Sequence, residues 1–366
     1  MKIKNPGIRI LDRYIIRKFL GTYFFAIALI IVIVVVFDAA ERMDDFLERH
    51  APFSEIVVTY YLNFIPYFIN QFSGLFTFIA VIFFTSKMAY QSEIIAILSS
   101  GVNFRRMLWP YFLSAAVITI ISLTLNLFVI PVANAHRLEF EARYFKKNLV
   151  TQYDRHIYRQ VYPGTFVYIR DYNGESRSAS FMALETYQDG AMVSSLEAAG
   201  ISFDPETTSW SAPQYITRTF EGETEIFEKH EKLDTVVNIT SEELDKVENL
   251  IKTMSTPELN RFIRQQKSKG SDMVAVFEVE RYNRVAYPVA TFVLTLIGVS
   301  LSSRKVRGGA GLHIGIGITL CFSYILFMKF AEEFAKGGIL PAVISIWIPN
   351  MIYAFIALYL YRKAPK

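Results

Sequence analysis

The chain has 366 residues, of which 52% are hydrophobic, 15% aromatic and 20% charged, and its net charge is +4. This apolar content is atypical of a soluble enzyme, while the charged content is too high for a bare bundle of membrane helices. The single cysteine, Cys321, excludes a disulfide framework and a cysteine metal site within one chain. The composition therefore favours a membrane protein that also has an aqueous domain.

Six apolar runs meet or approach the roughly 20 residues that are needed to cross a membrane. They are Leu20–Phe37, Thr59–Ser86, Arg106–Ile130, Val285–Leu301, Leu312–Phe330 and Leu340–Tyr361. The fourth run is short unless it extends towards Ala275. The first run follows a basic lead-in, but it is longer than the apolar part of a signal peptide and ends in Asp38-Ala39-Ala40-Glu41. We therefore predict a retained span there.

A polar insert separates these runs into two groups of three. The predicted parts are residues 1–130 with spans one to three, 131–273 as the aqueous domain, and 274–366 with spans four to six. With a cytoplasmic amino terminus, the inside segments hold fifteen Lys and Arg residues, and the two short outside loops hold four. This positive-inside asymmetry predicts that both termini are cytoplasmic and that the insert lies outside the cytoplasm.

Within the insert, the hydrophobic pattern changes to a twofold period. Asn173-Gly174 and Asp189-Gly190 are hairpin turn signals. The expected strands are Thr165–Ile169, Phe181–Tyr187, Met192–Phe203, Gln214–Phe220 and Thr235–Thr240. Several short strands without intervening helices favour a β sandwich or an open jelly roll.

The insert is predicted to close with a helix. Ser255-Thr256-Pro257-Glu258 has the pattern of a capped start, and the helix should run to Lys269 and stop at Gly270. Arg281 and Arg284 follow, with acidic residues three and four positions before them. Intrahelical ion pairs are the favoured interpretation of these arginines, and binding of an anionic lipid headgroup is the alternative.

A short amphipathic piece, Tyr90–Gly101, lies on the opposite side of the membrane from the insert. Its apolar residues are Ile94, Ile95, Ile97 and Leu98, and Gly101 is the expected C-terminal stop. Two interpretations fit this pattern. The helix either lies on the membrane surface, which the pattern alone slightly favours, or faces a cytoplasmic partner with Glu93 as its charged anchor.

The chain contains none of the common catalytic or nucleotide-binding motifs. A P-loop, a His-Glu-x-x-His motif and a Gly-x-Ser-x-Gly elbow are all absent, and the five histidines lack metal-ligand spacing. No carboxylate lies near the centre of a predicted span, so a proton or sodium relay has no obvious carrier. We therefore predict no catalytic residue, no metal or cofactor, and no nucleic-acid partner.

The fifth span carries a stripe of small residues that begins with Gly311-x-x-x-Gly315 and continues through Thr319 and Ser323. Such stripes let two helices approach closely. Packing within the bundle is the favoured interpretation here. A subunit interface is the alternative.

Several motifs occur together in a specific order along the chain. They are Leu11-Asp12-Arg13-Tyr14-Ile15, Ser92-Glu93-Ile94 through Gly101, Met254-Ser255-Thr256-Pro257-Glu258-Leu259, Gly298-Val299-Ser300-Leu301, Arg307-Gly308-Gly309, Gly338-Ile339-Leu340-Pro341 and Pro349-Asn350. In this order they resemble the LptF/LptG (YjgP/YjgQ) family of lipopolysaccharide export permeases. The first motif leans towards LptG. The similarity covers essentially the whole chain.

This resemblance implies an α-helical inner-membrane protein with six transmembrane helices (3+3) and an inserted periplasmic β-jelly-roll-like domain that ends in a helix. It implies a permease subunit of an ABC exporter that extracts lipopolysaccharide, with no enzymatic activity of its own. The implied partners are a cytoplasmic ABC ATPase dimer, a second permease subunit of the same family, periplasmic jelly-roll bridge proteins and lipopolysaccharide. A membrane-anchored assembly scaffold is the alternative function, and an ion-coupled lipid flippase ranks third.

The resemblance also implies roles for particular residues. Residues 90–101 become the coupling helix to the ATPase, which raises partner docking above the membrane-surface interpretation. Its docking residues would be Glu93, Ile94, Ile97, Leu98 and Gly101. The lipid path between the first and fifth spans would include Phe24, Phe25, Asp38, Arg42, Phe322, Phe327 and Lys329. Family members often place basic residues at the outer end of the first span, whereas here that end is net acidic.

Overall fold

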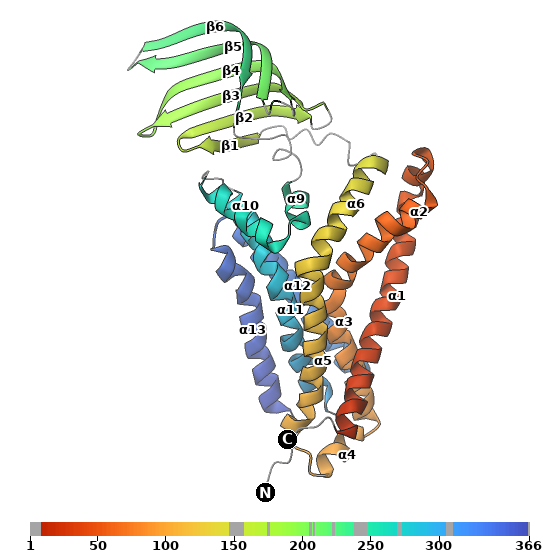
Figure 1. Cartoon of the computed structure of the whole chain (residues 1–366). Helices are drawn as coiled ribbons and strands as arrows, with labels where there is room; N and C mark the ends of the chain where they lie inside the picture. The colour runs from red at the N-terminus through yellow and green to blue at the C-terminus, as the bar shows by residue number, and fades with distance from the viewer. Residues whose placement is uncertain are drawn as a thin grey trace. The chain divides into compact units, whose positions relative to one another are not determined.

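The computed structural model describes residues 9–145, 157–173, 176–204, 207, 209–221, 224–237, 247–268, 273–304 and 310–364. The chain divides into two compact units (Figure 1). One unit consists of Met1–Asp44, Pro52–Arg137 and Glu278–Lys366, and the other consists of Asp45–Ala51 and Leu138–Phe277. Each unit is described separately below.

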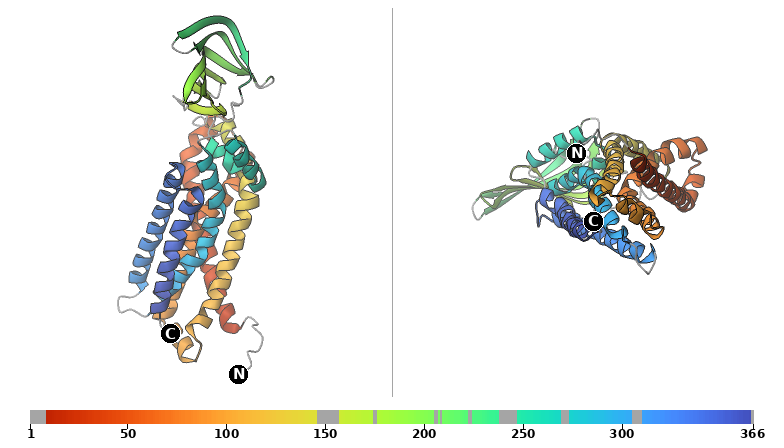
Figure 2. Two further views of the ribbon diagram at one scale, coloured as in Figure 1. Left: turned by 90° about the vertical axis from the view of Figure 1, so that its left-hand side faces the viewer. Right: turned by 90° about the horizontal axis from the view of Figure 1, so that it is seen from below.

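The first unit is a bundle of long helices that run side by side (Figure 2). Its elements, some of which continue into the second unit, are α1 (Ile10–Glu48), α2 (Phe53–Glu55), η1 (Ile56–Tyr61), α3 (Leu62–Tyr90), α4 (Glu93–Ser99), α5 (Phe104–Thr124), η2 (Leu125–Val129), α6 (Ile130–Tyr144), α11 (Val274–Ser302), α12 (Ala310–Lys336) and α13 (Ala342–Lys363). Within the described residues, six helical runs are long and apolar enough to cross a membrane. The prediction of six spans in two groups of three is therefore confirmed.

The third helical run is longer than the apolar pattern indicated. It continues as α5, η2 and α6 from Phe104 to Tyr144, past the point where the polar insert was expected to begin. A π-helical turn, η2, ends at Val129, two residues before Pro131. Proline has no N–H to donate to the preceding turn, and a wider turn allows the helix to continue past it. The polar sequence after Pro131 is therefore helical as far as Tyr144.

The second unit contains a six-stranded antiparallel sheet in the order β1-β2-β3-β4-β5-β6. Its strands are β1 (Ile157–Tyr162), β2 (Thr165–Asn173), β3 (Ser178–Gln188), β4 (Ala191–Asp204), β5 (Ser209–Glu221) and β6 (Thr224–Thr235). The predicted β domain is therefore confirmed, as one strongly twisted meander (Figure 2), whereas the jelly-roll arrangement stays a prediction. Its core gathers around Trp210, Val167, Ile169 and Met182, which are all fully buried.

The hairpin at Asp189-Gly190 forms as predicted, since both residues have positive φ values, 51° and 82°. Positive φ at both central positions is the requirement of the type I′ turn. The other turn signal is only partly described, because Asn173 ends β2 and Gly174 lies outside the described residues.

The strand expected at Thr235–Thr240 is not found where the structure describes it. Thr235 is the last residue of β6, Val236 and Val237 are irregular, and residues 238–240 lie outside the described residues. The strand β6 itself was missed because its sequence, TEIFEKHEKLDT, is highly charged and mostly exposed. Such a strand at a sheet edge lacks the apolar alternation that predicts a half-buried strand.

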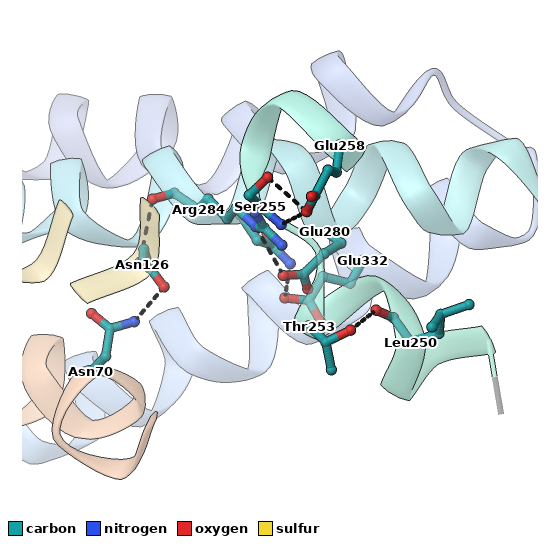
Figure 3. Close-up of polar contacts among 10 residues, drawn as sticks. Asn70, Asn126, Leu250, Thr253, Ser255, Glu258, Glu280, Arg284 and Glu332 are labelled. Atoms are coloured by element: carbon teal, nitrogen blue, oxygen red, sulfur yellow. Dashed lines mark hydrogen bonds and ion pairs between the residues drawn. The ribbon is translucent and has the colours of Figure 1, made fainter. Parts of the chain in front are cut away.

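The second unit also contains α9 (Val247–Thr253) and α10 (Thr256–Ser268). The backbone N–H and the hydroxyl of Ser255 each donate to Glu258 Oε2 at 2.8 Å (Figure 3). These two bonds, the hydroxyl bond most of all, hold the pKa of the Glu258 carboxyl below its usual range. The predicted capped start of this helix is therefore confirmed, while the predicted stop, Gly270, lies outside the described residues.

Candidate functional site

The short helix α4 connects α3 to α5 in the first unit. Ser92, just before it, and Gly101, just after it, both have positive φ values, 62° and 85°. The N–H of Gly101 donates to the carbonyl oxygen of Leu98 at 3.1 Å. A left-handed residue at this position ends a helix, and glycine adopts that conformation without steric cost. Gly101 is thus the C-terminal stop that the sequence predicted.

The apolar face of α4 packs against the chain's own bundle. Ile94 is 1% exposed and lies in a buried cluster with Ile15 and Phe19 of α1. Ile97 and Leu98 are partly buried against the same cluster. Ile94 is therefore a core residue of this chain and does not present its side chain to a partner, which corrects its predicted role.

The outward apolar residue of α4 is Ile95, whose side chain is 49% exposed. The helical period places residues 94, 97 and 98 on one face and residue 95 on another. From the sequence alone, the larger face was expected to meet a partner. That face is the one that holds α4 onto the bundle, and Ile95, on the other face, was not among the predicted docking residues.

The carboxylate of Glu93 is bound by two side chains of α1. The Tyr14 hydroxyl donates to Glu93 Oε2 at 2.8 Å, and Lys18 Nζ lies 3.3 Å from Glu93 Oε1. Lys18 Nζ also lies 4.3 Å from the centre of the Tyr14 ring, within range of a cation–π interaction. The Lys18 side chain is 31% exposed and the Glu93 side chain is 29% exposed. Glu93 is therefore engaged within the chain.

A second ion pair joins α1 to the start of α5. Arg106 donates to both carboxylate oxygens of Asp12, from Nη1 and Nη2, at 2.7 Å each. The Asp12 side chain is 3% exposed, and the backbone N–H of Arg9 also donates to it at 2.9 Å. The paired bonds fix both the distance and the orientation of the two helices. Neither residue could be assigned a role from the sequence, because the partners are 94 positions apart.

The aromatic residues predicted to meet lipid differ in exposure. Phe24, Phe25 and Phe322 are 46%, 71% and 54% exposed. Phe327 is instead partly buried, because it packs against the core formed by α3, α11, α12 and α13. The first three can therefore contact acyl chains around the single chain, whereas Phe327 mainly supports its own bundle.

The stretch of α1 from Ile33 to Glu41 lines a groove of about 470 Å³ together with α3. Its apolar lining includes Phe37, Phe64 and Phe68, and Asp38 and Glu41 also line it. The Tyr60 hydroxyl donates to Asp38 Oδ1 at 3.2 Å, and Arg42 interacts electrostatically with Asp38. The sequence predicted Asp38 and Arg42 for the lipid path, and the structure places Asp38 in a groove between two membrane helices.

Arg281 and Arg284 both form intrahelical ion pairs. Arg284 Nε lies 3.3 Å from Glu280 Oε1, and the Arg284 side chain is only 4% exposed (Figure 3). Arg281 Nη2 lies 3.6 Å from Glu278 Oε1. The favoured interpretation of these arginines is thus confirmed. The buried guanidinium of Arg284 is poorly placed for a lipid headgroup.

Lys329, near the C-terminal end of α12, pairs with Glu332 on the same helix at 2.8 Å. Glu332 is 5% exposed and also accepts hydrogen bonds from Asn283 at 3.0 Å and Tyr287 at 2.8 Å. A buried carboxylate needs such partners to offset its desolvation. This cluster joins α12 to α11, and the hydropathy pattern gave no sign of it.

Polar residues inside the spans converge on a proline in α11. Pro288 has no N–H, so the carbonyl of Arg284, four residues earlier, lacks its helical donor. Asn126 Nδ2 donates to that carbonyl oxygen at 3.3 Å, and Asn70 Nδ2 donates to Asn126 Oδ1 at 2.8 Å (Figure 3). The π-helical turn η2 contains Asn126. The asparagine thus replaces the donor that the proline removes.

This replacement leads to a testable expectation. Asn126→Leu should destabilise the purified chain by about 1–3 kcal/mol, because the carbonyl of Arg284 is left without a donor in an apolar interior. Pro288→Ala restores the helical N–H. The loss of stability caused by Asn126→Leu should therefore be smaller when Pro288→Ala is also present. Unfolding of all four proteins in detergent measures this coupling. An equal cost of Asn126→Leu in both backgrounds would contradict the assignment.

The small-residue stripe of α12 packs within the bundle at only one of its ends, where the Ser323 hydroxyl forms a hydrogen bond with the Tyr353 hydroxyl of α13. A side chain built on Gly311 or Gly315 would meet no described atom within 4 Å, and Thr319 is exposed. The close approach is made instead by Gly317, which faces Ile82 of α3. The favoured interpretation therefore holds at Ser323 but not at Gly311 and Gly315, for which the subunit interface is the alternative that remains.

Within the described residues, no three His, Cys, Asp or Glu side chains lie close enough to hold a metal ion. No curated protein matches the chain. The family described as lipopolysaccharide export system permease LptF/LptG matches residues 13–363. This match includes all six spans and the insert, and the family groups LptF and LptG together. Because it covers nearly the whole chain, the protein belongs to the LptF/LptG family of lipopolysaccharide export permeases.

Proposed function

We propose that this chain is the permease subunit of an ABC-type exporter that takes lipopolysaccharide from the inner membrane and passes it to a periplasmic bridge for outer-membrane assembly. The observation that carries this proposal is the family match over residues 13–363. The inserted β unit between the third and fourth spans supports it, because a lipid carrier needs both a membrane part and an aqueous part. A separate cytoplasmic ATPase dimer would hydrolyse the ATP.

The experiment that tests this function is purification of the full chain in detergent, followed by protein and lipid analysis. A permease should bring down an ATPase with a Walker motif and lipopolysaccharide together. A scaffold, which is the alternative function, should bring down other envelope proteins but neither of these two. Recovery of the chain without ATPase and without lipopolysaccharide would contradict the exporter assignment.

We infer that both termini and α4 lie in the cytoplasm and that residues 131–273 are periplasmic. Fifteen Lys and Arg residues in the proposed inside segments, against four in the short outside loops, support this orientation. A cysteine at Asp189, in the β3–β4 turn, should react with an impermeant thiol reagent in intact spheroplasts. One at Ser99, exposed on α4, should react only after permeabilisation. The reverse pattern would overturn the orientation.

The surfaces of the chain suggest where the three protein partners would bind. The ATPase would meet the outward side of α4, where Ile95 is half exposed. A second permease subunit would pack on the unfilled stripe of α12 at Gly311 and Gly315. A bridge protein would add a strand to an edge of the sheet, β1 or β6, because edge strands have unpaired backbone groups.

The lipid would pass between α1 of one subunit and α12 of its partner. Phe24, Phe25 and Phe322 are exposed on these two helices, which supports contacts with acyl chains. The apolar groove between α1 and α3 would then receive part of the lipid. Lys329 and Arg42 are cations near the outer ends of the same helices and would face the anionic headgroup.

A further inference from the structure

The helix α1 is fastened to the α4 end of the bundle by three kinds of contact. Tyr14 and Lys18 bind the carboxylate of Glu93, at 2.8 Å and 3.3 Å. Arg106 binds both oxygens of Asp12 at 2.7 Å. Ile94 of α4 is buried in the same apolar cluster as Ile15 and Phe19 of α1. A hydrogen-bonded ion pair, a bidentate ion pair and a buried apolar contact thus hold one short region of α1.

Beyond this region, the middle of α1 is much more exposed. In the most apolar stretch of α1 only 17% of the residues are buried, against 61% in the most apolar stretch of α11. Burial continues as far as Tyr23 and Ile27, but further along Val32, Val36 and Phe37 are 63%, 62% and 72% exposed. A helix transmits displacement along its axis because its backbone hydrogen bonds keep it stiff. A movement at the fastened end of α1 would therefore be carried to the exposed stretch around Val32 and Phe37, which borders the groove.

We propose that Tyr14 and Lys18 are positioning residues that, through Glu93, transfer a displacement of α4 to α1. The proposal rests on the function proposed above, in which an ATPase moves α4. It assigns the Glu93 carboxylate to a link inside the chain, whereas the sequence pattern favoured a direct bond from this carboxylate to the partner. The ATPase would hold α4 through its outward side, and the Glu93 link would pass the movement to the helix that lines the groove.

A charge exchange tests this link in the reconstituted exporter with its ATPase. Lys18→Glu and Glu93→Lys each place like charges together, so each should lower the lipopolysaccharide released per ATP hydrolysed by about threefold to fivefold. Lys18→Glu combined with Glu93→Lys restores an opposite-charge pair and should recover at least about half of the wild-type ratio. Arg17→Glu is the matched control, because it makes the same charge change at an exposed neighbouring position and should leave the ratio unchanged.

Assembly and thermal stability are measured in parallel, since a purely structural residue would change those and leave the export ratio of the intact complex unaltered. Tyr14→Phe removes one hydrogen bond without a charge change, so it should lower the ratio in a complex that still assembles. A wild-type ratio in Lys18→Glu would overturn the proposal. A combined variant as defective as Glu93→Lys alone would also overturn it, because Glu93 would then act on another partner. A wild-type preparation without ATPase or export would overturn the proposed function itself, before any variant is compared.

Discussion

Replacing Ile95 with aspartate should abolish co-purification of the ATPase with this chain. Ile95 is 49% exposed on a helix whose other large apolar residues face the chain's own core. Burial of the exposed half of this side chain in a partner is worth about 1 kcal/mol. An unpaired carboxylate in the same apolar contact costs several kcal/mol more. Together these changes should weaken the complex by about a hundredfold or more.

Two further variants make this result specific. Val236→Asp introduces the same charge at a 65% exposed position of the β unit and should leave the ATPase bound. Ile95→Ala removes only the apolar contact and should weaken binding without abolishing it. Leu98 is a poorer position for this test, because it is partly buried against the chain's own core and an aspartate there would disturb the fold. Retention of the ATPase by Ile95→Asp would refute docking through this surface.

Replacing Arg106 with leucine should produce the largest loss of stability among the substitutions considered. It leaves the carboxylate of Asp12, which is 3% exposed, without its bidentate partner. Removal of one partner from a buried pair usually costs about 3–5 kcal/mol, and the 36% exposure of Arg106 reduces our expectation to about 2–4 kcal/mol. The free energy of unfolding in detergent measures this loss.

A double variant distinguishes the loss of the Asp12–Arg106 ion pair from the loss of the Arg106 side chain itself. Asp12→Leu combined with Arg106→Leu removes both charges and should be closer to the wild type than Arg106→Leu alone, because no unpaired charge remains. Arg105→Leu changes an exposed neighbour and should alter stability by less than about 0.5 kcal/mol. If Arg106→Leu is as mild as Arg105→Leu, the pair does not fasten α1 to α5.

The elements that depend on local pattern could be predicted from the sequence. Hydropathy located the six spans, because a run of about 20 mainly apolar residues matches the thickness of the hydrocarbon core. The hairpin at Asp189-Gly190 and the capped start at Ser255 followed from the conformations that these residue types favour. The strand β6 could not be predicted in this way, because half of its side chains are charged and most are exposed.

Contacts between distant parts of the chain could not be predicted. Tyr14 and Glu93 are 79 positions apart, and Asn126 and Arg284 are 158 positions apart. No local period relates such pairs. Orientation was the second difficulty, because a helical period identifies the apolar face of α4 but does not say whether the bundle or a partner covers it. The same ambiguity affected the small-residue stripe of α12. The sequence pattern identifies Gly311 and Gly315, but in the structure it is Gly317 that packs closely against α3.

ATP-driven transfer of lipopolysaccharide tests the central claim most directly. Proteoliposomes that contain this chain, its second permease subunit, the ATPase and lipopolysaccharide are mixed with the periplasmic bridge protein, and lipid bound to the bridge protein is measured over time. We predict transfer that requires ATP and that is lost when this chain is omitted. ATP hydrolysis without any transfer of lipopolysaccharide, or transfer at the same rate without this chain, would contradict the account.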